Sequence, residues 1–521
     1  MEVADREGVR DGLSTVTRGT VYLLVATLLF VLFTFLARVL IVRSISKSDW
    51  DAFAFGLTAA GVLSAVGALG LPLAVARNLP YSTSDAERRT IVRTAIVVGG
   101  VAAAVSALAL GLLGPAIGNA LGSPAIGLGL EFFAVAACVN LIASLIASVF
   151  QGFADVFPNA LFVQVLNPGL FLVFLVAAVI LPPGQLTYHD ALFTYVLASI
   201  ITTLGLGFYA LRRIPRHLPR GPGAPHARAQ LLKFAAPLLV VGAMSNLLGS
   251  GDTLVLGVFR ASEVGTYSAS LTLARLLQVG ISSAGYIFLP VAARFVRRGD
   301  SRAVRLTYST VTKWLIVLSL PLLLLFEMLP AESLGFVYGH AYASVLLPLQ
   351  IAVIGAFVTT VLGPSSVAQV AYGYARLLAY NSVAAGVTDV VLALVLVPRW
   401  GYVGSAIAWT SAAVLYAGLA LVEISYSEGI HPFRRDFVVP VAVTGLPVAV
   451  LLLVFHPTVP GWLLPPFGLA LAGLFILVVI ATRSIDDGDR LLLEAVERLI
   501  GRPLPFVRRI GRRLIRRNTG G

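Results

Sequence analysis

The chain has 521 residues, of which 58% are hydrophobic and 12% are charged. Soluble globular proteins carry roughly 25% charged residues, so this composition excludes an ordinary soluble enzyme. A spanning helix needs about 20 apolar residues, and the chain has enough for about a dozen or more spans joined by short loops. The composition therefore predicts an all-α, polytopic integral membrane protein.

The net charge is +13, but the Lys and Arg residues cluster in the short segments between apolar runs. Membrane topology explains this arrangement, so nucleic acid is not expected as a partner. The single cysteine, Cys138, lies inside an apolar run, which excludes an internal disulfide and a thiolate metal cluster. The first apolar run, at 22–42, is longer than the hydrophobic region of a secretory signal, and we expect it to be a retained helix.

Hydropathy predicts fourteen transmembrane helices with short loops and no extramembrane domain. The apolar runs cover 20–42, 52–76, 91–114, 126–151, 160–181, 188–211, 231–252, 264–290, 311–330, 341–369, 376–397, 401–425, 437–456 and 462–482. With the N-terminus in the cytoplasm, 32 of the 38 Lys and Arg residues fall in cytoplasmic segments, four in outer loops and two within spans. We therefore expect a multi-pass protein of the cell membrane with both termini in the cytoplasm.

A basic segment at 212–230 contains five Arg, four Pro and two Gly residues and is predicted to be a cytoplasmic linker. It separates an N-terminal six-helix lobe at 1–211 from a C-terminal six-helix lobe at 231–425. Helices 13 and 14, at 426–482, are then an appendage, and 483–521 is a basic cytoplasmic tail. In that tail, apolar residues at helical spacing precede paired Arg residues, a pattern that predicts a helix lying on the anionic inner leaflet.

The two lobes share a weak internal repeat at an offset of 214 residues. The positions that match are Ser48, Asp49, Phe53, Leu57, Thr58 and Ala60 with Ser262, Glu263, Tyr267, Leu271, Thr272 and Ala274. Chance similarity between apolar segments is the alternative, and the polar members favour duplication. Because each lobe has an even number of spans, we expect two pseudo-symmetric lobes related by an axis along the membrane normal.

Several motifs give the sequence a family resemblance over nearly its whole length. They are Asp252-Thr-Leu-Val-Leu-Gly, Val264-Gly-Thr-Tyr-Ser-Ala, Val397-Pro-Arg-Trp-Gly-Tyr-Val-Gly-Ser-Ala-Ile-Ala, Phe150-Gln-Gly and the segment from Arg38 to Gly56. Their order and spacing resemble those of polysaccharide-export flippases in the multidrug/oligosaccharidyl-lipid/polysaccharide (MOP) exporter superfamily. The resemblance implies a flippase that moves a polyprenyl-(pyro)phosphate-linked oligosaccharide from the cytoplasmic to the outer leaflet. Asp389 departs from the family pattern, in which this position is usually uncharged or Asn, and leaves ion coupling open.

Arg275 is the first candidate for binding the phosphate of the substrate headgroup. It lies about half-way along the eighth predicted span, where insertion scales assign an Arg a cost of roughly 2.5–3.5 kcal/mol. A planar guanidinium matches phosphate oxygens two at a time, and a polyprenyl pyrophosphate would supply them. A structural ion pair with a nearby acid is the alternative.

The 214-residue offset also equates Arg38 with Asp252, two opposite charges near the outer ends of the first spans of their lobes. We expect them to pair across the cleft and close an outer gate when the protein faces the cytoplasm. In the alternative interpretation Arg38 reaches the membrane interface and Asp252 is solvated in a loop. The sequence alone does not decide between pairing and solvation for Arg38 and Asp252.

Further charged residues are candidates for headgroup guidance or ion coupling. Arg77 and Arg294 end predicted spans on the cytoplasmic side, where they could guide a headgroup or could simply set the topology. Glu131, Glu327 and Asp389 are the acids nearest to apolar surroundings, so a coupling proton or sodium ion would visit them, unless water at the span edges solvates them. Asp389 is in mid-span and is the best candidate of the three.

The sequence contains no phosphate-binding glycine loop and no His-Glu-x-x-His motif, so neither a nucleotide site nor a zinc site is expected. The expected partners are the lipid-linked oligosaccharide and membrane lipids, and the tail is an alternative docking site for a cytoplasmic glycosyltransferase. Two other functions are alternatives to a flippase. A multidrug or metabolite antiporter of the same fold would show an acidic, aromatic cleft, and a membrane glycan polymerase or ligase would need a large outer loop.

Overall fold

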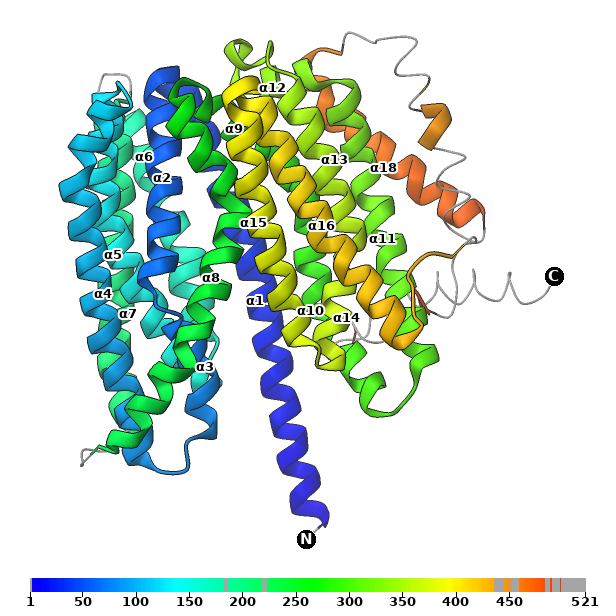
Figure 1. Ribbon diagram of the computed structural model, residues 1–521. Helices are drawn as coiled ribbons and strands as arrows, with labels where there is room; N and C mark the ends of the chain where they lie inside the picture. The colour runs from blue at the N-terminus through cyan, green and yellow to red at the C-terminus, as the bar shows by residue number, and fades with distance from the viewer. Residues whose placement is uncertain are drawn as a thin grey trace. The chain divides into compact units, whose positions relative to one another are not determined.

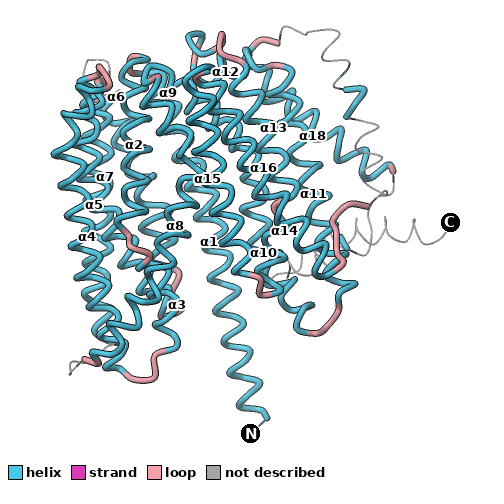
Figure 2. Tube along the Cα trace, in the orientation of Figure 1, coloured by secondary structure: helices cyan, strands magenta, loops and turns pink. Residues whose placement is uncertain are grey.

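The structure, a computed structural model, describes residues 2–181, 186–217, 223–434, 445–448, 450, 459–482, 488–489 and 497. Within these ranges the chain is helical and has no β-strand, as Figure 2 shows. Thirteen helical segments are long and apolar enough to cross a membrane, and they coincide with thirteen of the fourteen predicted spans. The all-α polytopic fold class is confirmed. The remaining span, predicted at 437–456, lies largely outside the described residues.

The chain forms two compact units. Unit 1 comprises Met1–Leu24, Ala269–Ala384 and Trp409–Gly521, and unit 2 comprises Val25–Ser268 and Ala385–Ala408. The boundary between the units falls inside four helices rather than in loops. The lobes expected from the repeat, 1–211 and 231–425, stay a prediction.

Unit 2 holds the helices of the N-terminal half (Figure 1). They are the later part of α1 (Glu2–Ser44), α2 (Lys47–Gly67), α3 (Leu71–Tyr81), α4 (Asp85–Ala120), α5 (Pro124–Gly152), the π-helix η1 (Asn159–Leu166), α6 (Asn167–Ile180), α7 (Tyr188–His217), α8 (Pro225–Phe259) and the short 3-10 turn η2 (Ala261–Glu263). The first residues of α9 (Val264–Ala274) and parts of α15 (Ala375–Trp400) and α16 (Tyr402–Glu428) complete it.

Helix starts in this unit follow local sequence signals. The Ser46 hydroxyl accepts a hydrogen bond from the backbone N–H of Asp49 at 3.2 Å and caps α2. The Ser84 hydroxyl caps α4 in the same way through the N–H of Glu87. Such side chains satisfy backbone donors that the first helical turn leaves without an intrahelical partner. Proline stands in the first turn of α5 and α8, where a missing N–H costs nothing.

A glycine breaks the second span into α2 and α3. Gly70 adopts φ +67°, a left-handed conformation that residues with a Cβ rarely adopt. A Cβ at this position would lie 2.4 Å from the carbonyl oxygen of Ala235 in α8. The glycine therefore permits both the change of direction between α2 and α3 and the close approach of α8.

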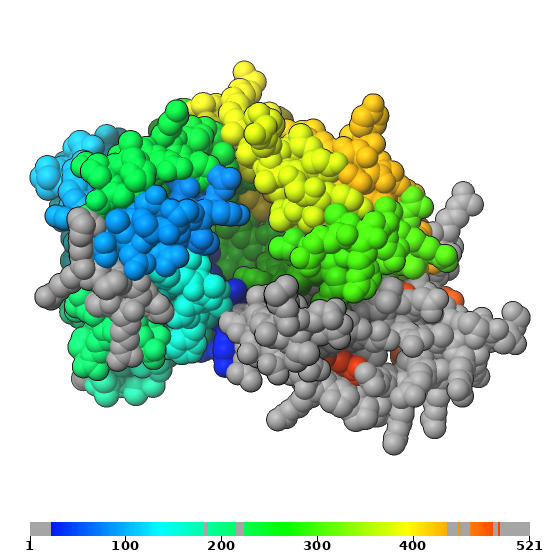
Figure 3. Space-filling model, turned by 90° about the horizontal axis from the view of Figure 1, so that it is seen from below, coloured from blue at the N-terminus to red at the C-terminus, as the bar shows by residue number. Residues whose placement is uncertain are grey.

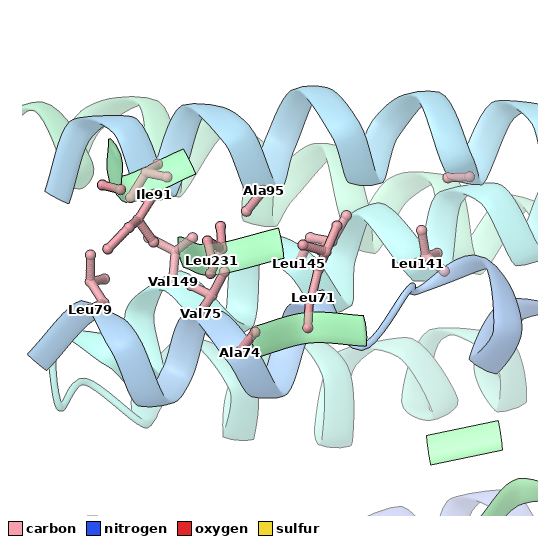
Figure 4. Packing of buried hydrophobic residues seen from close by; sticks show 14 residues of the cluster. Leu71, Ala74, Val75, Leu79, Ile91, Ala95, Leu141, Leu145, Val149 and Leu231 are labelled. Carbon is pink, nitrogen blue, oxygen red and sulfur yellow. The ribbon is translucent and has the colours of Figure 1, made fainter. Parts of the chain in front are cut away.

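The core of unit 2 is an apolar cluster between α3, α4, α5 and α8 (Figure 4). Its centre is made by Leu71 and Val75 of α3, Ala95 of α4, and Leu145 and Val149 of α5, all of which are buried. Helices α4 and α5 approach closely because small residues face each other. A Cβ on Gly118 would stand 2.6 Å from the backbone N of Gly127. Small residues at helix contacts are the usual means of tight packing in membranes, where lipid tails remove the hydrophobic driving force between helices.

One end of α8 is tied to the start of α4. Figure 3 shows the first turns of α8 beside the chain that joins α3 to α4. The His226 Nε2 lies 3.1 Å from Glu87 Oε1, and the N–H of Ala224 donates to the Thr90 hydroxyl at 2.8 Å. The last part of the predicted linker, at 224–230, is thus fixed to the N-terminal half by side chains on α4.

Unit 1 holds most helices of the C-terminal half. They are the later part of α9, the 3-10 turn η3 (Arg275–Gln278), α10 (Val279–Arg297), α11 (Ser301–Met328), α12 (Pro330–Tyr338), η4 (His340–Tyr342), α13 (Leu347–Leu362), α14 (Pro364–Tyr372), the start of α15 (Ala375–Trp400), most of α16 (Tyr402–Glu428), η5 (Gly461–Leu463) and α18 (Leu464–Ala481).

Two spans of unit 1 are discontinuous. The eighth span changes from α-helix to a 3-10 turn at Arg275 and resumes as α10. The tenth span is divided at Gly363-Pro364 into α13 and the shorter α14. Proline removes a backbone donor and sterically opposes a continuous helix, which explains the second break. Broken helices in membranes are tolerated where neighbouring groups satisfy the freed backbone atoms.

Candidate functional site

Arg275 stands at the first residue of the 3-10 turn in unit 1. Helix α13 holds this turn, because the Thr360 hydroxyl donates to the carbonyl of Leu277 at 3.2 Å and the Gln278 amide donates to the Thr359 hydroxyl at 2.9 Å. The Arg275 guanidinium lies over the ring of Trp409 on α16, 5.7 Å from the ring centroid. Arg275, the residue predicted to bind the headgroup phosphate, is therefore positioned by a helix break, by hydrogen bonds between its turn and α13, and by the ring of Trp409.

This cation–π contact leaves the Arg275 side chain half-buried. The N–H groups at the edge of a guanidinium are the groups that bind phosphate oxygens. Trp409 is itself buried and was not singled out from the sequence. No sequence signal identified it, since its contact with Arg275 joins segments 134 positions apart.

Two acids of the sequence analysis lie against each other in unit 2. Asp252 on α8 and Asp389 on α15 are both fully buried, and the backbone N–H of Asp252 donates to Asp389 Oδ2 at 3.1 Å. The Ser405 hydroxyl of α16 donates to the Asp252 carbonyl at 3.3 Å. Gly251 makes this approach possible, because a Cβ there would lie 3.0 Å from the same Asp389 oxygen. Two buried carboxylates at one helix contact are a candidate site for a cation.

Arg38 lies on α1 in unit 2, half-buried and close enough to Tyr195 of α7 to act on it electrostatically. The Tyr195 hydroxyl hydrogen-bonds the side chain of Asn140 on α5, which accepts a hydrogen bond from the Asn167 amide at 3.2 Å. Asn167 directly follows the π-helix η1, and π-helical turns are frequent at functional sites. Direct pairing of Arg38 with Asp252 stays a prediction.

This polar cluster, Asn140, Asn167 and Tyr195, was missed by sequence reasoning. The sequence signal for these residues is the presence of uncharged polar side chains inside apolar runs. The π-helix η1 contributes another polar side chain inside an apolar run. Its Gln164 side chain accepts a hydrogen bond from the Thr27 hydroxyl of α1 at 2.9 Å. Helix α1 is thereby joined to the polar side of η1.

The remaining predicted cations lie at helix ends. Arg77 on α3 is exposed, and its guanidinium lies 4.2 Å from the ring centroid of Phe234 on α8. Arg294 is half-buried in the last turn of α10. The positions of Arg77 and Arg294 agree equally with guiding the headgroup and with setting the membrane topology.

The remaining predicted acids differ in environment. Glu131 is exposed on α5. Glu327 is half-buried near the end of α11, where its carbonyl accepts a hydrogen bond from the Gln350 amide at 3.0 Å. Its Oε2 is buried and has no hydrogen-bond partner among the described residues. Glu327 belongs to unit 1, whereas the Asp252 and Asp389 contact belongs to unit 2.

A further contact, which we call the α2–α9 clasp, joins Trp50, Asp51 and Gly265 within unit 2. Asp51 Oδ1 accepts a hydrogen bond from the N–H of Gly265 at 2.6 Å, and the Trp50 indole N–H donates to the carbonyl of the same glycine at 2.8 Å. Gly265 follows Asp51 by 214 positions, the offset of the sequence repeat. Contact between equivalent positions is what a two-fold axis produces, so the clasp supports the predicted pseudo-symmetry.

No group of three or more His, Cys, Asp or Glu side chains in the described part of the chain could hold a metal ion. Unit 1 has one candidate site, Arg275 with Trp409. Unit 2 has two, the Asp252 and Asp389 contact and the cluster of Asn140, Asn167 and Tyr195.

Three solved structures, of a flippase and of two transporters, share this arrangement of helices. The structure of the lipid II flippase MurJ in an inward closed conformation has a TM-score of 0.70 and 12% identity, covering 88% of this chain and 98% of that chain. An inward-facing multidrug resistance MATE family transporter of the MOP superfamily has a TM-score of 0.58 and 13% identity, covering 77% and 94%. An outward-facing MATE structure has a TM-score of 0.51 and 14% identity, covering 80% and 98%. The chain thus has the fold of MOP exporters.

A family model assigns the chain to one family among the proteins with this fold. The family model described as polysaccharide biosynthesis protein matches residues 16–296, more than half of the chain. The chain belongs to this polysaccharide biosynthesis protein family, which confirms the resemblance drawn from its motifs. A comparison with curated proteins finds no match.

Proposed function

We propose that the chain is a flippase for a polyprenyl-(pyro)phosphate-linked oligosaccharide, moved from the cytoplasmic to the outer leaflet by alternating access. The product would serve assembly of a cell-surface polysaccharide or a glycoprotein glycan. The observation that carries the proposal is membership in the polysaccharide biosynthesis family, in a chain that shares its fold over most of its length with a lipid II flippase.

Arg275 is proposed to bind the phosphate of the headgroup. The guanidinium is the kind of group that a pyrophosphate requires, and it lies at a helix break rather than within a continuous span. Arg38, Arg77 and Arg294 are proposed to assist, either in the headgroup site or at the entrance to it. The lipid tail is proposed to remain in the bilayer throughout.

Purified protein in proteoliposomes tests this role of Arg275 with a fluorescent polyprenyl-pyrophosphate oligosaccharide. We expect Arg275→Ala to weaken the apparent affinity by roughly tenfold to a hundredfold, since hydrogen bonds to charged groups contribute about 1.5–3 kcal/mol. Arg275→Lys should restore part of it, because lysine keeps the charge and loses the planar fork. Arg298→Ala, at the exposed end of α10, is the matched control and should behave as the unmodified chain. Equal activity of all four proteins would remove Arg275 from the site.

Asp252 and Asp389 are proposed to bind a coupling proton or sodium ion, with Glu131 and Glu327 as secondary candidates. Supporting this, the two aspartates are buried against each other at a helix contact. Asp389→Asn should uncouple transport from a sodium or proton gradient while leaving movement down a substrate gradient. Persistence of full gradient-driven transport in that variant would count against the pair.

A multidrug or metabolite antiporter is the second candidate, favoured by the fold similarity to MATE transporters. Depletion of the protein in its own cells separates the two functions. A lipid-linked sugar that accumulates on the cytoplasmic leaflet is the result expected for a flippase. Loss of drug resistance without any accumulation would favour the antiporter. We propose no enzymatic activity, and docking of a glycosyltransferase by the tail falls on residues largely outside the described ranges.

A further inference from the structure

Four uncharged polar side chains occur where η1 and the start of α6 contact α5 and α7 in unit 2. They are Gln164 of η1, Asn167 of α6, Asn140 of α5 and Tyr195 of α7, and we call them the polar track. The Asn167 amide donates to Asn140 Oδ1 at 3.2 Å, and the Tyr195 hydroxyl lies beside the Asn140 side chain. The sites proposed for phosphate and for a coupling ion use none of these four residues.

Two atoms of the polar track are accessible to a ligand. Gln164 Oε1 accepts a hydrogen bond from the Thr27 hydroxyl, which leaves Gln164 Nε2, and Asn167 Nδ2 donates to Asn140, which leaves Asn167 Oδ1. Neither of these atoms has a hydrogen-bond partner among the described residues, and neither is fully buried. The two side chains are half-buried and lie within one helical turn of each other. One free donor and one free acceptor therefore remain inside an apolar span.

Aromatic packing fixes the Tyr195 end of the polar track. The Tyr195 ring makes edge-to-face contacts with Phe133 and Phe171, with centroids 5.3 and 5.1 Å away, and with Phe53 at 6.4 Å. Because three phenyl rings hold the phenol, its hydroxyl keeps its place beside Asn140. A phenol hydroxyl both donates and accepts, so it is a third hydrogen-bonding group of the track.

The chemistry of the polar track determines the class of ligand. Its amides and hydroxyl carry no charge, no Asp or Glu among the described residues hydrogen-bonds to them, and the charge that acts on Tyr195 is that of Arg38. A cation would be repelled by Arg38, and amides are weaker partners for a phosphate than charged donors are. A neutral ligand with several hydroxyl groups fits, because each hydroxyl can accept from Gln164 and donate to Asn167.

We propose that the polar track is a carbohydrate-binding site for the sugar of the lipid-linked oligosaccharide. Gln164 Nε2 donates to a sugar oxygen and Asn167 Oδ1 accepts from a sugar hydroxyl. Asn140 is a positioning residue, because its bond with Asn167 orients the Asn167 amide. The inference rests on the proposed function, since it concerns the same substrate, and it makes recognition of the sugar separable from binding of the phosphate by Arg275.

Native mass spectrometry of the purified full-length protein in lipid nanodiscs tests the site with two probes. One probe is the lipid-linked oligosaccharide fraction extracted from the cells that produce the chain, and the other is a polyprenyl pyrophosphate without sugar. We expect the unmodified protein to bind the sugar-bearing probe about tenfold more tightly. Gln164→Ala and Asn167→Ala should each reduce this preference about three- to tenfold, because each removes one hydrogen bond, and should leave the affinity for the sugar-free probe unchanged.

Gln151→Ala is the matched control, because Gln151 is an exposed amide at the end of α5, and it should keep the preference. Arg275→Ala should weaken the binding of both probes to a similar extent. Retained binding of the sugar-free probe shows that a variant is folded. A preference that is unchanged in both Gln164→Ala and Asn167→Ala, or equal weakening of both probes in these variants, overturns the carbohydrate site.

The unmodified protein separates failure of this inference from failure of the proposed function. If it binds both probes with equal affinity, the carbohydrate site is lost and the flippase proposal stands. If it binds neither probe, both proposals are lost.

Discussion

Asp389 illustrates how a single buried side chain holds a helix contact in unit 2. Its Oδ2 accepts the backbone N–H of Asp252, and both residues are fully buried. A buried polar group that loses its partner costs about 1–3 kcal/mol. We therefore expect Asp389→Leu to lower the free energy of unfolding by about that amount and Asp389→Asn, which keeps an acceptor, to change it little.

Thermal unfolding in detergent measures both changes. Asparagine is isosteric with aspartate, whereas leucine shares its branching but is larger, so a difference between the two variants reports the hydrogen bond together with packing. If the two variants unfold at the same temperature, the contact with Asp252 has no energetic role.

Gly265 in the α2–α9 clasp leads to a second prediction for one residue. A Cβ there would lie 2.4 Å from Trp50 Cδ1 and 2.6 Å from Asp51 Oδ1. Overpacking of this kind costs about 1–3 kcal/mol, so Gly265→Ala should lower the unfolding temperature. Gly61→Ala on α2 is the control, since a Cβ there meets nothing within 4 Å. That variant should be neutral or stabilising by about 0.5–1 kcal/mol, because alanine favours the helix. Equal stability of the two variants would contradict the close packing.

At the scale of elements, a buried ion pair joins α11 to Asp489, which follows α18 in sequence. Lys313 Nζ lies 2.6 Å from Asp489 Oδ2, and the Trp314 indole N–H donates to Asp489 Oδ1 at 2.7 Å. The Lys313 side chain is only 2% exposed and that of Asp489 is 12% exposed. Removal of one member of a buried pair typically costs about 3–5 kcal/mol, because it leaves an uncompensated charge.

We therefore expect Lys313→Met to destabilise unit 1 strongly and the double variant Lys313→Met/Asp489→Leu to recover most of the loss. Arg88→Met is a comparison at the surface, where the pair with Asp85 is exposed and should contribute about 0–1 kcal/mol. Chemical denaturation in mild detergent provides the measurement. A double variant no more stable than Lys313→Met would show that the ion pair is not the source of the effect.

Only some of the interruptions within the transmembrane helices are predictable from the sequence. Gly363-Pro364 is a visible breaking signal, whereas the 3-10 turn at Arg275 and the π-helix at 159–166 carry no such signal. The turn at Arg275 is held to α13 through the hydroxyls of Thr359 and Thr360, which lie more than 80 positions away in sequence. Local propensity does not contain that information, because the bonds that decide it are tertiary.

At the scale of the whole molecule, the membrane topology remains a prediction that can be tested. The distribution of Lys and Arg predicts that the chain joining α3 to α4 lies in the cytoplasm and that the chain joining α4 to α5 lies outside. In a Cys138→Ser background, Tyr81→Cys should resist a membrane-impermeant thiol reagent in intact cells, and Ser123→Cys should react. Permeabilised cells are the control, in which both should react. The opposite labelling pattern would invert the topology and place both termini outside.

The sequence by itself determined the fold class, the positions of the spans and the family, because hydropathy over about 20 residues and the order of motifs are properties of the linear chain. It also identified Arg275, Asp252 and Asp389 as candidates, since a charge inside an apolar run is conspicuous wherever it lies. Only the tertiary structure decided their neighbours. It placed Trp409 under Arg275, joined Asp252 to Asp389, and brought Asn140, Asn167 and Tyr195 together. The physical reason is that hydrogen bonds and ring contacts act over a few ångströms in space, and the helices that bring these side chains together are distant in sequence.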